Sequence, residues 1–319
     1  MSDNVINFKE LMRIEKRAAK EKRLKAKQKS KIEEARNDTA IDSLITKKAE
    51  LVPEDVQQQI SKRKPHWPTQ CCSLQNRCSI LQAHYVSNQD IKDVFYIPNF
   101  LTRDYQNAVL SWLQTLPRLD GITVSQKNKS CQKLQEEECN GKWVRLKHAQ
   151  RNVALFDLRH ERIPFLLRAL CNILIEINAF PKSHPPNHVL INEYEPQNGI
   201  LPHTDGPLYL DRTATFSIGG GDVLFKFTKR FESQKEKEKC AVKDTAENDR
   251  PVMEVKLNGL GSLIFFTGEA YTNYCHSIND RIGTTEHVSQ YCINSSHSGE
   301  VVKRGYRISL TFRHKINVL

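Results

Sequence analysis

The stretch NHVLINEYEPQNGILPHTDGPLY, residues 187–209, opens the part of the chain that decides the fold. Its beginning, HVLINEY (188–194), is mostly apolar and is followed by Pro, Asn and Gly, so it predicts a short strand. Further runs of this kind follow, separated by Gly, Pro and Asn turns: TATFSIG (213–219), DVLFKF (222–227), VMEVKL (252–257), SLIFFT (262–267) and YRISLTFR (306–313). Many short strands at this spacing predict a sandwich or jelly roll.

The residues before this stretch predict one more strand and two supporting helices. VFYIPNF (94–100) has the composition of a strand, and Thr102 is a candidate N-cap for a helix over roughly 103–116, closed by Pro117. A second helix is expected at about 161–179, where apolar residues recur at three- and four-residue spacing: Ile163, Leu166, Leu167, Leu170, Ile173, Leu174 and Ile177. The expected fold class is α+β, mainly β: a jelly-roll core with supporting N-terminal helices, preceded by a basic helical tail.

Composition divides the chain into three parts. Residues 1–50 are expected to form the basic helical tail, residues 51–85 a polar linker, and residues 86–319 one globular domain. Two stretches interrupt the strand pattern of that domain, at 231–250 and 280–303. Both are expected to be surface loops inserted between strands.

The basic tail carries much of the net charge. The chain has a formal charge of +11, and residues 9–36 contain twelve Lys and Arg against five Glu. This segment is rich in helix-forming residues but loses its apolar face early, so it is expected to be a solvated helix, a nucleic-acid-binding arm or an import signal. The basic run KRAAKEKRLKAKQKSK (16–31) is compatible with nuclear import, and we expect the protein in both nucleus and cytoplasm.

Cysteine usage indicates a reducing compartment. The chain has nine cysteines, an odd number, and neither a leader nor a long apolar run near Met1, so neither secretion nor membrane insertion is expected. His66, Cys72, Cys78 and His84 recur every six residues. That spacing leaves a zinc site open but does not match close Cys and His pairs, and coincidence in a polar linker is the other interpretation.

Two residues of the opening stretch have the right chemistry and spacing for a metal. His203 and Asp205 are two residues apart, so in an extended chain both side chains leave the same face. One further His would complete a set of two imidazoles and one carboxylate that leaves positions open for a co-substrate and oxygen. His276 follows a strongly apolar strand and is the preferred third ligand, whereas His287 and His297 lie in a polar stretch expected to be a surface loop.

The last strand carries two arginines that could hold an acidic ligand. RISLTFR (307–313) alternates, with Arg307 and Arg313 on the same face. Guanidinium groups bind carboxylates in a bidentate manner, so side chains leaning inward could converge on one short dicarboxylate; an exposed edge strand is the alternative. Asn192 and Tyr194 share one face just before the metal candidates and offer an amide and a phenol to the same ligand.

The order NxY, HxD, distal His and RxxxxxR resembles that of the AlkB-like family of Fe(II)- and 2-oxoglutarate-dependent dioxygenases, over roughly residues 90–319. The resemblance implies a double-stranded β-helix, Fe(II) bound by His203, Asp205 and His276, and 2-oxoglutarate bound by Asn192, Tyr194, Arg307 and Arg313. It also implies oxidation of an N-methyl group by O2, with release of succinate, CO2 and formaldehyde.

The resemblance further places KWVRLKHAQRN (142–152) in the lid that family members use for substrate. Trp143, Arg145, Lys147 and Arg151 are therefore candidate substrate residues, able to stack a base and to meet a phosphate backbone. An exposed basic run around one buried Trp is an equally good interpretation. Methylated nucleic acid, reached through the lid and the basic tail, is the leading substrate hypothesis, with methylated protein behind it.

Three other functions remain open. A JmjC-type protein hydroxylase shares the HxD and distal His, but usually holds its co-substrate with a Lys and a hydroxyl instead of the arginines of RISLTFR. A nucleic-acid-binding protein on a scaffold without turnover would keep salt-sensitive binding after loss of the metal ligands. A metal-binding jelly roll that does not use 2-oxoglutarate would lack the converging arginines.

Overall fold

The computed structural model describes residues 77–86, 88–119, 140–146, 151–159, 163–230, 250–280 and 283–316. The tail predicted over 1–50, residues 51–76 of the predicted linker with the zinc candidates His66 and Cys72, and residues 231–249 of the first insertion lie outside the described residues. Lys147 of the candidate lid also lies outside them.

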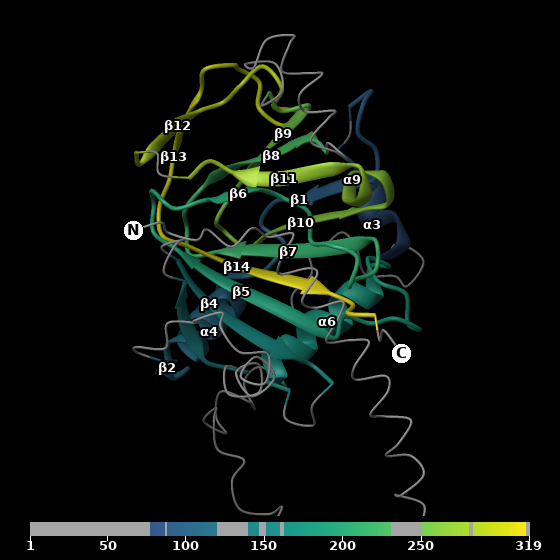
Figure 1. The fold of residues 1–319 in the computed structure, drawn as a ribbon, viewed down its shortest axis with the longest axis vertical. Coiled ribbons are helices and arrows are strands. Elements are labelled where there is room, and N and C mark those ends of the chain that lie inside the picture. The colour runs from purple at the N-terminus through teal and green to yellow at the C-terminus, as the bar shows by residue number, and fades with distance from the viewer. Residues whose placement is uncertain are drawn as a thin grey trace, which may run out of the picture.

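Two sheets face each other in the described part of the chain (Figure 1). The larger sheet contains, in spatial order, β1 (Val94–Ile97), β10 (Ser262–Thr267), β7 (Arg212–Ile218), β14 (Arg307–Arg313), β5 (His188–Tyr194), β4 (Arg151–Asp157), β3 (Trp143–Leu146) and β2 (Arg118–Leu119). The smaller sheet contains β6 (Ile200–His203), β11 (Tyr274–Ile278), β8 (Val223–Lys229) and β9 (Met253–Leu257). The mainly β fold class expected from the sequence is confirmed.

The chain alternates between the two sheets from β5 onward. It runs from β5 in the larger sheet to β6 in the smaller one, returns to β7, continues through β8 and β9, and then takes β10, β11 and β14 in alternation. All these pairings are antiparallel. This winding is that of a jelly roll, and it places the ends of strands distant in sequence around one interior space.

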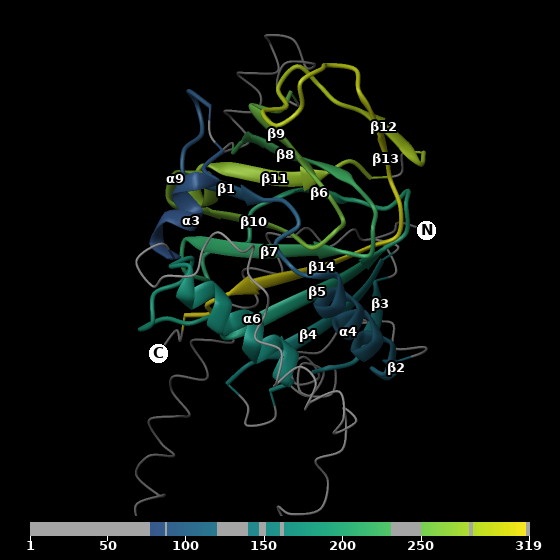
Figure 2. The ribbon, with the colours of Figure 1, turned by 180° about the vertical axis from the view of Figure 1, so that it is seen from behind.

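Two helices cover the outer face of the larger sheet (Figure 2). In α4 (Arg103–Gln114), the Thr102 side chain accepts a hydrogen bond from the backbone N–H of Tyr105, as its predicted role of N-cap requires. The helix α6 (Phe165–Glu176) is shorter than the predicted 161–179. Its apolar face packs with Ile308, Leu310 and Phe312 of β14 in one core. None of the described helices is long and apolar enough to cross a membrane.

The described core begins before residue 86, where the sequence predicted the start of the domain. The helix α3 (Arg77–Ala83) contributes Ile80 and Leu81, which are buried in the same core as α4. Tyr85 contacts Phe95 of β1, with ring centroids 5.3 Å apart. The start of the domain was predicted too far toward the C-terminus. The apolar residues of α3 form a single short turn that follows a long polar and proline-containing segment, so little in the sequence indicated them.

The second insertion, residues 280–303, is not a plain surface loop as expected. It contains a two-stranded sheet of β12 (Thr285–His287) and β13 (Val301–Lys303), and Val288 and Val302 are buried against Leu224 of β8. The sequence signal was weak because Val288 and the pair Val301 and Val302 are flanked by polar residues.

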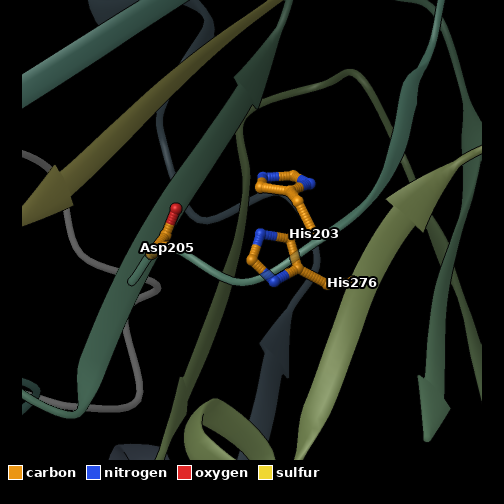
Figure 3. A group of neighbouring side chains, drawn as sticks. All are labelled: His203, Asp205 and His276. Carbon is orange, nitrogen blue, oxygen red and sulfur yellow. The ribbon is translucent and has the colours of Figure 1, made fainter. Parts of the chain in front are cut away.

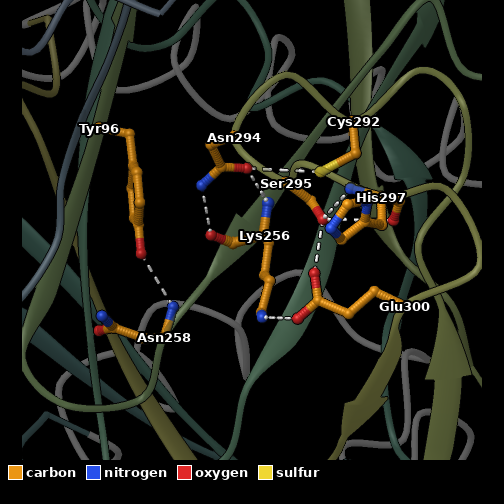
Figure 4. Close-up of polar contacts among 8 residues, drawn as sticks. All are labelled: Tyr96, Lys256, Asn258, Cys292, Asn294, Ser295, His297 and Glu300. Carbon is orange, nitrogen blue, oxygen red and sulfur yellow. Dashed lines mark hydrogen bonds and ion pairs between the residues drawn. The ribbon is translucent and has the colours of Figure 1, made fainter.

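The same insertion covers the free edge of β9. Asn294 acts as a substitute for a neighbouring strand: its Oδ1 accepts from the N–H of Lys256 and its Nδ2 donates to the Lys256 carbonyl, both at 2.8 Å (Figure 4). The backbone of Tyr291 and Ile293 bonds to Glu254 in the same way. An uncovered edge strand can pair with a strand of another chain. Residues 291–294 of the insertion occupy the edge of β9 and prevent such pairing.

Candidate metal and co-substrate site

The three predicted metal ligands come together in the interior, near the end of β6 (Figure 3). His203 is the last residue of β6, and its direct cross-strand partner is His276 of β11. Asp205 follows in the turn after β6. One ligand atom from each of the three side chains lies within 4.8 Å of the others, and no other such group of three or more occurs among the described residues.

The Asp205 carboxylate is buried, and only one of its two oxygens has a hydrogen-bond partner among the described residues. Its Oδ1 accepts a hydrogen bond of 2.8 Å from Nη1 of Arg313, whereas its Oδ2 has no hydrogen-bond partner among the described residues. Burial by itself raises the pKa of Asp205, but the positive charge of Arg313 is the largest of the effects that oppose burial, and the net shift of the pKa is downward. The group is therefore ionised, with one oxygen available to a cation.

The two imidazoles are neutral. Burial lowers the pKa of His203, and burial together with the nearby His203 ring lowers the pKa of His276 to about 3. His203 Nδ1 lies 2.8 Å from the Leu201 carbonyl oxygen, which can only accept, so Nδ1 carries the proton and Nε2 keeps its lone pair. Phe225 stacks on His276 with centroids 5.6 Å apart and holds that ring in place.

This donor set suits a divalent transition metal. Two neutral imidazoles and one carboxylate on one side of an ion leave several coordination positions free. The unpartnered Asp205 Oδ2 is the observation that tests the fit, because a buried carboxylate oxygen without a partner costs free energy that a bound cation would recover. The residues present therefore fit the Fe(II) expected from the sequence.

A second cationic group lies at the other end of β14. Arg307 is buried, and its Cζ lies 4.3 Å from the centre of the Tyr194 ring, its direct cross-strand partner on β5. Its Nη1 has a long contact of 3.5 Å to Ser217 Oγ, while Nε and Nη2 have no hydrogen-bond partner among the described residues. Asn192 lies on the same face of β5. This arrangement of unused donors fits a bound carboxylate.

The two arginines serve different ends of the site. Arg313 forms an ion pair with Asp205, one of the three candidate metal ligands. Arg307, six residues before Arg313 on β14, lies against the Tyr194 ring on β5. The sequence indicated that both face one side of the strand but not which partner each would have. One guanidinium group therefore lies beside the metal candidates and the other beside Tyr194, on the same strand.

Some residues that shape the site were not recognised in the sequence. Tyr209 lies under Arg313, with the guanidinium carbon 4.5 Å from the ring centre. The Tyr271 hydroxyl donates to the carbonyl of Gly206 at 3.2 Å and anchors the turn that carries Asp205. Both tyrosines are adjacent to the quoted motifs, in HTDGPLY and GEAYTNYCH, which was the available signal.

The predicted lid residues divide between the two faces of the larger sheet. Trp143 is 2% exposed, belongs to the helix-covered core and donates from Nε1 to the Leu113 carbonyl at 3.0 Å, so the expectation that it stacks a substrate base is wrong. Arg145 is exposed and shares that face. Arg151 instead shares the inner face with Asn192 and Tyr194.

The chain belongs to the 2OG-Fe(II) oxygenase superfamily, whose sequence model matches residues 93–313. It is thus an AlkB-like oxygenase that uses Fe(II), 2-oxoglutarate and O2. A zebrafish (Danio rerio) protein described as "Probable RNA/DNA demethylase ALKBH6" is 27% identical over 241 residues, which cover 72% of this chain and 88% of that protein. The AlkB-like resemblance is confirmed, and so is the closer likeness to AlkB homologue 6 that residues 187–209 and 262–278 carry together.

Two solved structures match this chain at lower sequence identity. OsALKBH1 is 16% identical, with a TM-score of 0.41, and the match covers 69% of this chain and 97% of that one. A Pseudomonas putida prolyl-4-hydroxylase is 11% identical, with a TM-score of 0.40, covering 76% of this chain and 99% of that one.

Proposed function

We propose that the enzyme removes N-linked methyl groups from nucleic acid by oxidation. His203, Asp205 and His276 hold the Fe(II), and Asn192, Tyr194, Arg307 and Arg313 hold 2-oxoglutarate. The overall change consumes one 2-oxoglutarate and one O2 per methyl group and yields succinate, CO2 and formaldehyde, with the nitrogen left carrying hydrogen. Bound Fe(II) supplies the activation of O2 that this oxidation needs.

The observation that carries the proposal is the pairing of two unsatisfied groups in one buried interior. Asp205 Oδ2 lacks a partner beside two neutral imidazoles, and Arg307 keeps two donors without acceptors. A cation at the first place and a carboxylate at the second would satisfy both. Strand β14 connects the metal candidates with the carboxylate-binding candidates. Its Arg313 stabilises the ionised Asp205, and its Arg307 lies at the other end of the same strand.

Support for a nucleic-acid substrate is of a different kind. The zebrafish relative is described as a probable RNA/DNA demethylase, and the chain has a formal charge of +11. Arg145, within the segment predicted as the lid, is an exposed cation, whereas Trp143 contributes to the core. Methylated protein is the alternative substrate. The location in nucleus and cytoplasm predicted from the tail is part of the same proposal.

The test is turnover of the purified protein loaded with Fe(II) without air. Succinate from 2-oxoglutarate and formaldehyde are measured with N-methylated RNA, N-methylated DNA and matched unmethylated strands. We expect equal amounts of succinate and formaldehyde only with a methylated strand, and neither product with Asp205→Ala. Succinate formation stimulated by a methylated peptide and by no oligonucleotide would contradict the nucleic-acid part while leaving the oxygenase intact.

A further inference from the structure

Arg151 lies in a row of side chains that crosses the inner face of the larger sheet. β4 pairs with β5 so that Asn152 faces Glu193 and Val153 faces Asn192, which brings Arg151 next to Tyr194. Tyr194 in turn pairs with Arg307 of β14. The two guanidinium carbons lie 5.8 Å and 4.3 Å from the centre of the Tyr194 ring, so the phenol is held between two cations.

Arg151 also forms a hydrogen bond with the side-chain amide of Asn192. Nε of Arg151 donates to Asn192 Oδ1 at 3.1 Å. An amide side chain can present either its oxygen or its NH2 group in nearly the same shape, and its hydrogen-bond partners decide between them. Since a guanidinium group only donates, Arg151 binds the oxygen and turns the NH2 group of Asn192 away from β4.

That orientation matters for an acidic ligand. A carboxylate or keto oxygen only accepts hydrogen bonds, so it is stabilised by the NH2 group of an amide and repelled by its oxygen. Arg307 supplies charge at the same end of the sheet. The contact between Arg151 and Asn192 therefore prepares the site for an anion before the anion binds, which lowers the cost of binding.

We propose that Arg151 is a positioning residue for 2-oxoglutarate: it fixes the amide of Asn192 with its NH2 group available to the co-substrate and confines the Tyr194 ring beside Arg307. This assignment rests on the proposed co-substrate role of Asn192, Tyr194 and Arg307. It replaces the interpretation of Arg151 as a substrate residue, because its guanidinium contacts the co-substrate candidates on the inner face.

The test measures 2-oxoglutarate binding by calorimetry, with Mn(II) in place of Fe(II) and no nucleic acid present. We expect Arg151→Met to weaken 2-oxoglutarate binding about 10- to 100-fold, as for loss of a charge-assisted hydrogen bond. Arg151→Lys should recover part of that loss. Mn(II) affinity and melting temperature should stay at wild-type values, and KM for 2-oxoglutarate should rise while kcat at saturation changes little.

Two matched variants sharpen this test. Arg145→Met removes a cation from the neighbouring strand on the opposite face and should leave 2-oxoglutarate binding unchanged. In an Asn192→Ala background, Arg151→Met should cause only a small further loss, because most of its effect passes through the missing amide and the remainder through its contact with Tyr194.

Three outcomes would overturn the assignment. Unchanged 2-oxoglutarate binding with a raised KM for a methylated oligonucleotide would make Arg151 a substrate contact. A parallel loss of Mn(II) binding and thermal stability would make it a structural residue, and full additivity with Asn192→Ala would remove the proposed route. If the wild-type protein itself failed to bind 2-oxoglutarate, the proposed function would fail first, and that result is distinguishable from all three.

Discussion

Arg313 and Asp205 form a buried ion pair, with 2.8 Å between Nη1 of the arginine and Oδ1 of the aspartate. Each buried charge is compensated by the opposite charge of its partner, so removal of one side chain leaves an uncompensated charge in the interior. The pair also joins the last strand of the jelly roll to the turn after β6, and the stability of the protein without metal should depend on it.

This dependence can be measured with a double-mutant cycle. Arg313→Gln should lower the free energy of unfolding of the metal-free protein by about 3–5 kcal/mol, because Asp205 stays buried and charged. Adding Asp205→Asn should recover part of the loss, giving a coupling energy of about 1–3 kcal/mol in urea unfolding. Additive effects of the two substitutions would show that the pair is not coupled.

Arg307 should control affinity for 2-oxoglutarate without affecting the metal. Its Nε and Nη2 lack partners among the described residues, and Arg307→Gln removes the charge that they would offer to a carboxylate. Calorimetry with Mn(II) present should show 2-oxoglutarate binding weakened about 10- to 100-fold, with Mn(II) affinity retained. Arg168→Gln, on the exposed face of α6, is the control and should bind as the wild type does.

Acid should destabilise the metal-free protein through His188. Burial, followed by the charges of Arg313 and Lys315, lowers the pKa of His188 to about 3. Asp157 and Asp205 oppose that shift. The unfolded chain takes up a proton near pH 6.5, where the folded one does not, so stability is fully present above that pH and falls as the pH is lowered toward 3.

Urea unfolding between pH 4 and 6 measures the contribution of His188. Each proton bound only by the unfolded chain adds about 1.4 kcal/mol per pH unit to the slope. His188→Phe should therefore reduce the wild-type slope by that amount. Identical slopes in the two proteins would mean that His188 does not titrate differently in the folded and unfolded chains.

Trp143 should behave as a core residue. Trp143→Ala should cost about 3–5 kcal/mol of unfolding free energy, because the ring is buried between the sheet and α4. Trp143→Phe keeps most of the packing but loses the hydrogen bond to the Leu113 carbonyl, and should cost about 1–3 kcal/mol. A raised KM for methylated oligonucleotide with normal stability would restore the stacking hypothesis.

Asn294 should protect the edge of β9. Asn294→Ala removes both hydrogen bonds to the Lys256 backbone, so amide hydrogen exchange at Lys256 should accelerate and unfolding free energy should fall by about 1–2 kcal/mol. Ser296→Ala, an exposed position in the same insertion, is the matched control. Unchanged exchange at Lys256 would show that other contacts of the insertion protect this edge.

Much of the fold was predictable because strand and cap signals are local. The runs 188–194 and 262–267 coincide with β5 and β10, and Thr102 caps α4. The spacing of His203 and Asp205 was also readable, since two residues two positions apart share a face in extended chain. The insertion at 280–303 was misread because its few valines lie in a stretch that is mostly polar.

The sequence by itself determined which residues alternate on each strand, and therefore that Arg307 and Arg313 lie on one face and that His203 and Asp205 lie close together. Only the tertiary structure decided that His276, 73 residues beyond His203, is its cross-strand partner, that Asp205 is the partner of Arg313, and that Trp143 faces the helices while Arg151 faces the interior. Alternation is a property of a single strand. Pairing register, and the face that points inward, depend on how distant strands pack together.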